Sequence, residues 1–296
     1  MVWLLIVNPM AGGGKAAKVV PELRSRLRDL GMEAEIRISK YHLHAVKLAE
    51  EFVSQGYRNI ICVGGDGTLH EVAGAIVKSG KSDEVVLGVI PIGVGNDFCR
   101  SLGIPHDLAG SLEVIRRGKI RQLDLGRMED VYFVNSMGAG LDAVIARKAE
   151  QSRSLPGGLR YLYALFSSLL RLRSYPLEVE ADGEKRKLNA LMVSVGNGSY
   201  CGRGFRLCPQ AELDDGKLDL CIVQSIPLIR VIMSLPAVIK GTHLRFSYVS
   251  YRQPGNILIS CDGELPLYCD GELPTLKDKR QIRIDILPRK INVICP

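Results

Sequence analysis

The feature that most constrains the fold is a regular alternation of strand and helix patterns over residues 1–126. Short β-branched apolar runs predict strands, and the amphipathic stretches between them predict helices. This order is typical of a parallel sheet wrapped by helices, which binds its ligands at the carboxyl ends of the strands. The predicted strands are residues 3–7, 33–38, 59–63 and 85–91, and the predicted helices are residues 15–30, 44–55, 69–78 and 108–117.

The pattern changes after residue 126 to short strands separated by Gly, Asn and Asp turns, which is typical of an antiparallel β-sandwich. We therefore predict an α/β protein with an N-terminal parallel-sheet domain (residues 1–126) and a C-terminal antiparallel β-sandwich domain (residues 127–287). Residues 288–296 are a candidate to complete the first domain. The second half has predicted strands at residues 131–135, 177–180, 188–196, 218–223, 257–261 and 282–287, and predicted helices at residues 159–173 and 228–241.

The net charge of +7 predicts contact with an acidic partner, such as nucleotide phosphates or anionic lipid headgroups. Nucleic acid is not expected as a partner, because aromatic residues make up only 6% of the chain and its Lys and Arg residues are scattered. The eight cysteines include no CxxC pair and no His at zinc-ligand spacing, so a sulfur-bound metal is not expected.

The chain opens with an apolar run that has no basic leader and no cleavage site, and we interpret it as a first strand. Reduced thiols and a cytoplasmic location are therefore expected. No apolar stretch reaches the roughly 18 uninterrupted residues that span a bilayer. We expect any membrane contact to be peripheral, at the inner membrane surface.

The first predicted strand ends in a glycine-rich loop that is a candidate phosphate site. Its glycines permit close backbone approach ahead of a helix N-terminus, and a lysine lies beside them. It is not a Walker A loop, because Pro9 stands at the first glycine position and Ala16 replaces the Ser or Thr that holds magnesium. A flexible turn is the alternative. The loop residues are Asn8, Pro9, Met10, Ala11, Gly12, Gly13, Gly14 and Lys15.

The third predicted strand ends in a loop with three glycines around an aspartate. Asp66 is predicted to lie in a surface loop beside a nucleotide phosphate, and Thr68 is predicted to cap the next helix. A plain tight turn would need only one glycine. The loop residues are Gly64, Gly65, Asp66, Gly67, Thr68, Leu69 and His70.

The fourth predicted strand is followed by Gly93, Val94, Gly95, Asn96 and Asp97. A dinucleotide fingerprint is excluded here because Phe98 stands at the last glycine position. Asn96 and Asp97 have an alternative role as caps of the next helix. Three such loops at successive strand ends are predicted to converge on one crevice.

These motifs resemble those of bacterial diacylglycerol kinases and related lipid kinases. The resemblance depends on residues 64–68, with Asn8 and Pro9 upstream and residues 91–97 downstream in matching order and spacing. It continues through residues 122–126, 135–142, 196–197 and 214–218 to a late Asp-Gly-Glu, and so covers essentially the whole chain. The 64–68 motif alone is less specific, because NAD kinases carry it too.

The resemblance implies that residues 1–126 form the nucleotide-binding domain and that ATP is bound by residues 8–12 and 64–70. Two further family positions that contact nucleotide correspond to Ser39 and Val94. Ser39 keeps a hydroxyl, whereas Val94 lacks one, so only a backbone contact is implied there.

The resemblance also implies Mg²⁺. One ion corresponds to the Asp215 carboxylate with the backbone carbonyls of Glu212 and Lys217, and a solvated Asp-Gly turn is the alternative. Asp66, Asp97 and Asp124 are candidates for the acidic network around a catalytic ion, although Asp124 has helix capping as an alternative role. Lys15 and Arg100 are candidates to hold phosphate.

The catalytic base of the family is the Glu of the late Asp-Gly-Glu, and the sequence CDGELP occurs twice. We predict Glu272 and not Glu264. Residues 265–272 resemble the family strand that leads into the motif, and Glu264 would leave a far longer tail.

The implied function is transfer of the γ-phosphoryl group of ATP to a lipid hydroxyl, with diacylglycerol converted to phosphatidic acid. The alternatives are an NAD kinase-like enzyme with a soluble acceptor and a non-catalytic lipid- or nucleotide-binding protein, which the loss of a hydroxyl at Val94 favours. The expected partners are a lipid alcohol and, transiently, a membrane surface contacted by the basic amphipathic residues 160–173. The alternative for this stretch is a core helix with solvated arginines. The sequence leaves a homodimer open.

Overall fold

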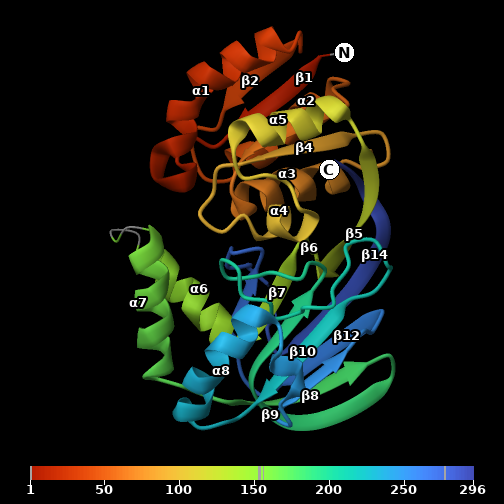
Figure 1. Ribbon diagram of the computed structural model, residues 1–296. Helices are drawn as coiled ribbons and strands as arrows, with labels where there is room; N and C mark the ends of the chain where they lie inside the picture. The colour runs from red at the N-terminus through yellow and green to blue at the C-terminus, as the bar shows by residue number, and fades with distance from the viewer. Residues whose placement is uncertain (1, 153–154, 156, 277) are drawn as a thin grey trace. The chain divides into compact units, whose positions relative to one another are not determined.

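The computed structural model describes residues 2–152, 155, 157–276 and 278–296 (Figure 1). The chain divides into two compact units, and each is described by itself. Unit 1 comprises Met1–Asp124 and Arg289–Pro296, and unit 2 comprises Leu125–Pro288.

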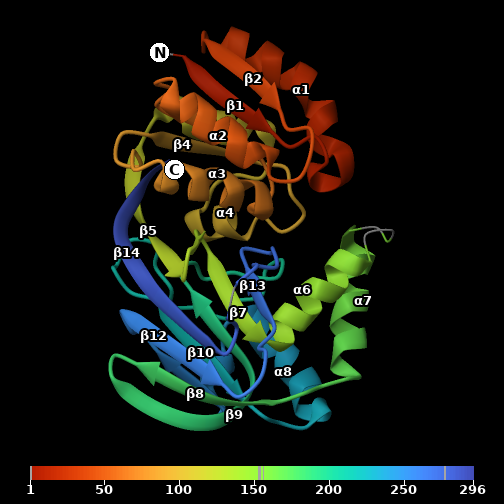
Figure 2. The ribbon, with the colours of Figure 1, turned by 180° about the vertical axis from the view of Figure 1, so that it is seen from behind.

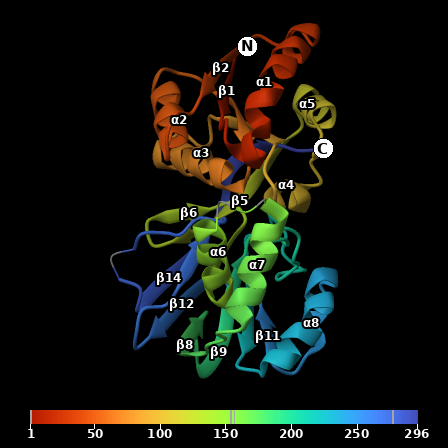
Figure 3. The same ribbon diagram turned by 90° about the vertical axis from the view of Figure 1, so that its left-hand side faces the viewer.

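Unit 1 is built on a parallel sheet with the strand order β4-β3-β1-β2. The central strands are continuous apolar runs because both faces of the sheet are covered by helices. Figure 3 shows α1 and α5 on one face and α2 and α3 on the other. The elements are β1 (Trp3–Val7), α1 (Ala11–Asp29), β2 (Ala34–Ile38), α2 (His44–Ser54), β3 (Asn59–Gly64), α3 (Asp66–Lys78), β4 (Val86–Pro91), α4 (Asp97–Leu102) and α5 (Leu108–Arg117).

Two strands belong partly to each unit. β5 (Ile120–Met128) leaves unit 1 after Asp124, and β14 (Gln281–Ile294) enters unit 1 at Arg289. The end of β14 pairs in parallel with β4, through Asn292 opposite Val86. The sequence pattern predicted that the last strand ends at residue 287, but the strand continues into the tail.

Unit 2 is an antiparallel β-sandwich. Its longest ladder has the order β11-β10-β9-β8-β12-β14, and β9 pairs with β8 along its first half and with β7 along its second (Figure 2). The strands are β6 (Val131–Phe133), β7 (Ser136–Gly140), β8 (Tyr175–Ala181), β9 (Glu184–Gly196), β10 (Asp219–Gln224), β11 (Val249–Arg252), β12 (Asn256–Cys261) and β13 (Leu267–Cys269).

Unit 2 also carries a layer of helices with its own apolar cluster. This cluster joins Leu141 and Ile145 of the first helix to Leu165 of the second and Val231 of the third. The helices are α6 (Leu141–Gln151), α7 (Gly157–Leu169) and α8 (Leu228–Lys240), followed by the short 3₁₀ helix η1 (His243–Arg245). None of the helices among the described residues is long and apolar enough to cross a membrane.

The predicted parallel and antiparallel halves are confirmed, and several elements were missed, among them β11 and η1. α4 has only six residues, which is too short for a periodic pattern. β5, β7 and α6 were also missed. β7 is the sequence SMGAG, whose small residues lack strand propensity although all five are buried.

Candidate functional site

Three loops at the carboxyl ends of β1, β3 and β4 meet in unit 1. The Asn8 side-chain amide donates to Thr68 Oγ1 at 3.0 Å, which joins the loop after β1 to that after β3. A Cβ on Gly12 would lie 2.3 Å from the Ile92 carbonyl oxygen, so the loop after β1 also contacts the one after β4. The predicted convergence of these loops is confirmed.

The loops after β3 and β4 approach each other through bare backbone. A Cβ added to Gly93 would lie 2.5 Å from the Gly65 Cα, and one added to Gly65 would lie 3.0 Å from the Gly93 Cα. The distance at Gly93 leaves no room for a side chain, and the distance at Gly65 is tighter than ordinary van der Waals contact. The contact between the two loops therefore requires glycine at position 93 and favours it at position 65.

Asp66 is the first residue of α3 and is half-buried, so its predicted place in a surface loop was wrong. The Phe98 N–H donates to Asp66 Oδ1 at 3.3 Å, which links the start of α3 to the start of α4. A carboxylate in the first turn of a helix also interacts favourably with the helix dipole. Asp66 is thus held in place at the meeting point of two loops.

Thr68 does not cap α3, contrary to the prediction. It lies within the helix, 5% exposed, and accepts the hydrogen bond from Asn8. The N-cap residue is Gly65, and no side chain caps the helix. The first amides of α3 are therefore not satisfied by a side-chain cap, which is the arrangement that binds anions at helix N-termini.

Asn96 closes the third loop upon itself. Its Oδ1 accepts from the Gly93 N–H at 2.9 Å and its Nδ2 donates to the Gly93 carbonyl at 3.1 Å. It stands at the N-cap position of α4 in a left-handed conformation, but its side chain does not cap that helix. Asp97 begins α4 and is 6% exposed, whereas Val94 is 48% exposed.

Asp124 lies in β5 and is 1% exposed. Its Oδ1 accepts from the backbone N–H of Arg289 at 2.7 Å, so it ties the returning tail to unit 1. Among the described residues, no group of three or more His, Cys, Asp and Glu side chains is arranged to hold a metal ion. An ion near Asp66, Asp97 and Asp124 would need oxygens from nucleotide or water to complete its coordination.

The other predicted nucleotide residues of unit 1 lie around these loops. Ser39 follows β2, is 8% exposed and donates its backbone N–H to the Val7 carbonyl at 2.8 Å. Lys15 and Arg100 are exposed and Met10 is 75% exposed. Half-buried positions are occupied by Asn8, Pro9, Ala11, Gly12, Gly67 and His70, while Gly64 and Leu69 are buried.

The predicted metal turn of unit 2 spans residues 212–217. Asp215 is half-buried and its Oδ1 accepts from the Lys217 N–H at 3.0 Å, while Glu212 and Lys217 are exposed. Nearby Asp219 is fully buried, and its burial raises the pKa of its carboxyl to about 6. The negative charge of Asp215 raises that pKa further.

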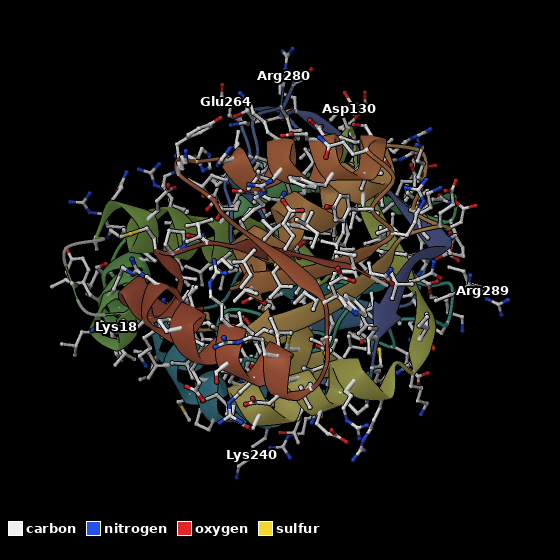
Figure 4. The ribbon with its side chains drawn as sticks, turned by 90° about the horizontal axis from the view of Figure 1, so that it is seen from above. Lys18, Asp130, Lys240, Glu264, Arg280 and Arg289 are labelled. Carbon is white, nitrogen blue, oxygen red and sulfur yellow. The ribbon has the colours of Figure 1, made fainter. Side chains whose placement is uncertain are left out.

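The two Asp-Gly-Glu copies of unit 2 differ in structure. Glu264 is exposed in the connection between β12 and β13, and Figure 4 shows its side chain pointing outward. Glu272 is half-buried in a tight turn, in which the Cys269 N–H donates to the Glu272 carbonyl at 2.8 Å and the Glu272 N–H donates back at 2.9 Å. Only the second copy is built into a fixed turn.

Asp270 is an important residue that the sequence prediction missed. It is 3% exposed, and its carboxylate accepts the backbone N–H groups of Val134, Asn135 and Ser136 at 2.8 to 2.9 Å. Asn197 braces the same segment, because its Nδ2 donates to the Val134 carbonyl at 2.8 Å. The pairing of Asp270 with Glu272 in one turn was visible in the sequence, but its distant partners were not.

Comparison with known proteins gives matches over nearly the whole chain. A model of the diacylglycerol kinase catalytic domain matches residues 2–128, and a model of the YegS C-terminal NAD kinase beta sandwich-like domain matches residues 135–295. A diacylglycerol kinase of Staphylococcus aureus strain MRSA252 is 32% identical over 264 residues, which cover 89% of this chain and 83% of that relative. The chain belongs to the diacylglycerol kinase family.

The structural comparison agrees with this assignment. A crystal structure of a diacylglycerol kinase from Bacillus anthracis strain Sterne matches with a TM-score of 0.81 and 25% identity, covering 99% of this chain and 96% of that chain. The chain is therefore a lipid kinase of the diacylglycerol kinase family, and it matches both domain models. The resemblance that the sequence motifs indicated is confirmed.

The repeated motif supplies a matched test of the Asp270 turn of this kinase. Asp270→Ala leaves three backbone N–H groups without their carboxylate partner, and we expect the free energy of unfolding to fall by about 2 to 4 kcal/mol. Asp262→Ala, in the exposed first copy, should change it by less than about 0.5 kcal/mol. Urea denaturation followed by circular dichroism measures both. Equal effects of the two substitutions would contradict the structural role of Asp270.

Proposed function

We propose that this kinase transfers the γ-phosphoryl group of ATP to the hydroxyl of diacylglycerol and so forms phosphatidic acid. The observation that carries the proposal is the meeting of three glycine-bearing strand ends around Asp66, in a chain of the diacylglycerol kinase family. Parallel sheets bind ligands at this edge, and backbone amides at a helix N-terminus favour phosphate.

The ATP phosphates are proposed to contact the backbone of residues 64–67 at the start of α3. The uncapped helix start and the close Gly65–Gly93 approach both favour an anion at this point. Lys15 is exposed on the first turn after Gly14 and supplies a cation from the loop after β1. Ser39 contributes a hydroxyl, whereas Val94 offers only its backbone.

Magnesium fits the donor chemistry of both candidate sites. Asp66, Asp97 and Asp124 are not arranged as one three-carboxylate group among the described residues, so an ion held by Asp66 would take its other oxygens from the nucleotide phosphates and water. The Asp215 carboxylate would hold a second ion with the carbonyls of Glu212 and Lys217. One or two carboxylates completed by neutral oxygens and water are what Mg²⁺ prefers. The ion, when bound, neutralises phosphate charge.

Glu272 is proposed as the base that takes the proton of the lipid hydroxyl. As the oxygen–hydrogen bond breaks, that oxygen forms a bond to the γ-phosphorus, and ADP leaves with the electrons of the broken phosphoanhydride bond. A general base must be held in position, and the turn fixed by Asp270 supports this role for Glu272. Glu264 is exposed and does not lie in a turn of this kind.

The acceptor is tested with radiolabelled ATP, Mg²⁺ and a panel of alcohols, followed by chromatography of the products. The panel contains diacylglycerol, monoacylglycerol, ceramide, sphingosine, an isoprenoid alcohol and NAD. Labelled phosphatidic acid as the main product supports the proposal. Label on NAD would instead indicate an NAD kinase-like enzyme, and ATP binding without any labelled product would indicate a non-catalytic protein.

The two Asp-Gly-Glu copies provide a matched pair for the base. Glu272→Gln should lower turnover by about 10² to 10⁴, because the amide cannot accept the proton. Glu264→Gln makes the same atom change on an exposed side chain and should leave turnover unchanged. A dead Glu264→Gln enzyme with an active Glu272→Gln enzyme would show that the first copy supplies the base.

Asp66→Asn tests the nucleotide loop without removing the acceptor for Phe98. We expect the fold to be retained and turnover to fall by about 100-fold or more, because the charge that organises metal and phosphate is lost. Asp107→Asn is the control, since Asp107 caps α5 in unit 1 by accepting from Gly110 at 2.8 Å and an asparagine caps equally well. Full activity of a folded Asp66→Asn protein would remove Asp66 from the mechanism.

A further inference from the structure

Helix α8 is apolar on both of its faces, although only one is covered. Its inner face buries Val231 and Ala237, and Val231 belongs to the apolar cluster of the helical layer. Its outer face exposes Ile229, Ile232 and Met233 by 63%, 41% and 72%. A helix that is hydrophobic all round is normally covered on every side, by protein or by lipid. The outer face of α8 is therefore a candidate contact surface.

Helix α7 presents a similar outer stripe in the same unit. Within the predicted basic stretch, Arg160 of α7 is half-buried, whereas Arg171 and Arg173 are exposed beyond the end of the helix. Side chains spaced by four residues expose apolar surface, because Leu162 and Phe166 of α7 and Leu170 just after its end are exposed by 52%, 54% and 80%. Figures 1 and 3 show α7 and α8 on the same side of unit 2.

A cavity of about 320 Å³ connects the two helices. It is lined by Leu170 and Arg173, which follow α7, and by Ile226 and Leu228, where α8 begins. The cavity thus lies between the end of the α7 stripe and the first residue of α8, and Arg173 lines it. We call the exposed apolar residues of the α7 stripe and of the outer face of α8 the helical face. They are Leu162, Phe166, Leu170, Ile229, Ile232 and Met233.

The charged residues of α7 and α8 are all positive. Neither α7 nor α8 contains Asp or Glu, whereas Arg230, Lys240 and Arg173 are exposed. Figure 4 shows the Lys240 side chain pointing outward. Exposed apolar residues flanked by cations and free of acids are typical of helices that lie in the surface of an anionic bilayer.

We infer that the helical face, with the outer surface of α8 as an essential part, docks the kinase on an anionic lipid bilayer. The inference rests on the proposed function, because diacylglycerol is supplied from such a bilayer. A second copy of the chain is a poorer occupant. Symmetric pairing through this face would bring Arg230 and Lys240 of both copies together without an acid from either helix.

Vesicle sedimentation in the absence of ATP tests the inference. Met233→Asp places a charge on the outer face of α8, and its binding to phosphatidylcholine vesicles with 30% phosphatidylglycerol should fall by about tenfold or more. Ile120→Asp is the control, because Ile120 is 49% exposed in unit 1 and the change in net charge is the same. Circular dichroism confirms that both variants fold. Wild-type binding by folded Met233→Asp would overturn the inference.

Tryptophan fluorescence gives a second measurement of bilayer contact. The chain has one tryptophan, Trp3 in unit 1, so Met233→Trp adds a reporter to unit 2. Its emission should shift to the blue and be quenched by brominated phospholipids, whereas the wild-type emission should not change. No shift with anionic vesicles, together with a dimer in sedimentation equilibrium that Met233→Asp dissociates, would show that the face binds a second copy.

Turnover of a water-soluble short-chain diacylglycerol separates this inference from the proposed function. Met233→Asp should phosphorylate dispersed dioctanoylglycerol at the wild-type rate while losing activity on vesicles. If the wild-type protein binds vesicles through α8 but phosphorylates no diacylglycerol, the proposed function fails and the docking surface stands.

Discussion

The contact between the backbones of Gly65 and Gly93 is the constraint on which the candidate nucleotide site depends. A Cβ on Gly93 would lie 2.5 Å from the Gly65 Cα and one on Gly65 would lie 3.0 Å from the Gly93 Cα, so this close approach depends on the absence of a side chain at Gly93 and favours glycine at position 65. Their approach brings Asp66 within reach of the Phe98 amide and leaves the start of α3 without a side-chain cap. The phosphate site proposed for unit 1 thus depends first on backbone geometry and then on the charged side chains beside it.

The candidate base of unit 2 also depends on contacts with backbone groups, but there a charged side chain makes them. There, one buried carboxylate, that of Asp270, accepts three consecutive backbone amides and fixes the turn that carries Glu272. The cost of burying a charge is offset by these hydrogen bonds. The same tripeptide eight residues earlier has no such partners and is exposed, so the environment decides which glutamate is a credible base.

Much of this organisation could be predicted from the sequence, because apolar periodicity and glycine spacing are local signals. They located the parallel strands and the loops that meet at Asn8, Thr68 and Gly93. Contacts over long sequence separations could not be predicted, among them the hydrogen bond from Asn8 to Thr68 and the backbone amides that surround Asp270. The outward apolar stripe of α7 was also missed, since periodicity alone does not reveal which face of a helix is covered.

The most direct measurement is a crystal structure of the protein with Mg²⁺ and a non-hydrolysable ATP analogue. The account predicts that the β- and γ-phosphates accept hydrogen bonds from backbone amides of residues 64–67, with Asp66 beside the metal. The Gly65–Gly93 contact should be unchanged, because the phosphates bind to backbone amides that this close approach positions. Nucleotide bound elsewhere in the chain, with the loops after β1, β3 and β4 free of phosphate, would contradict the account.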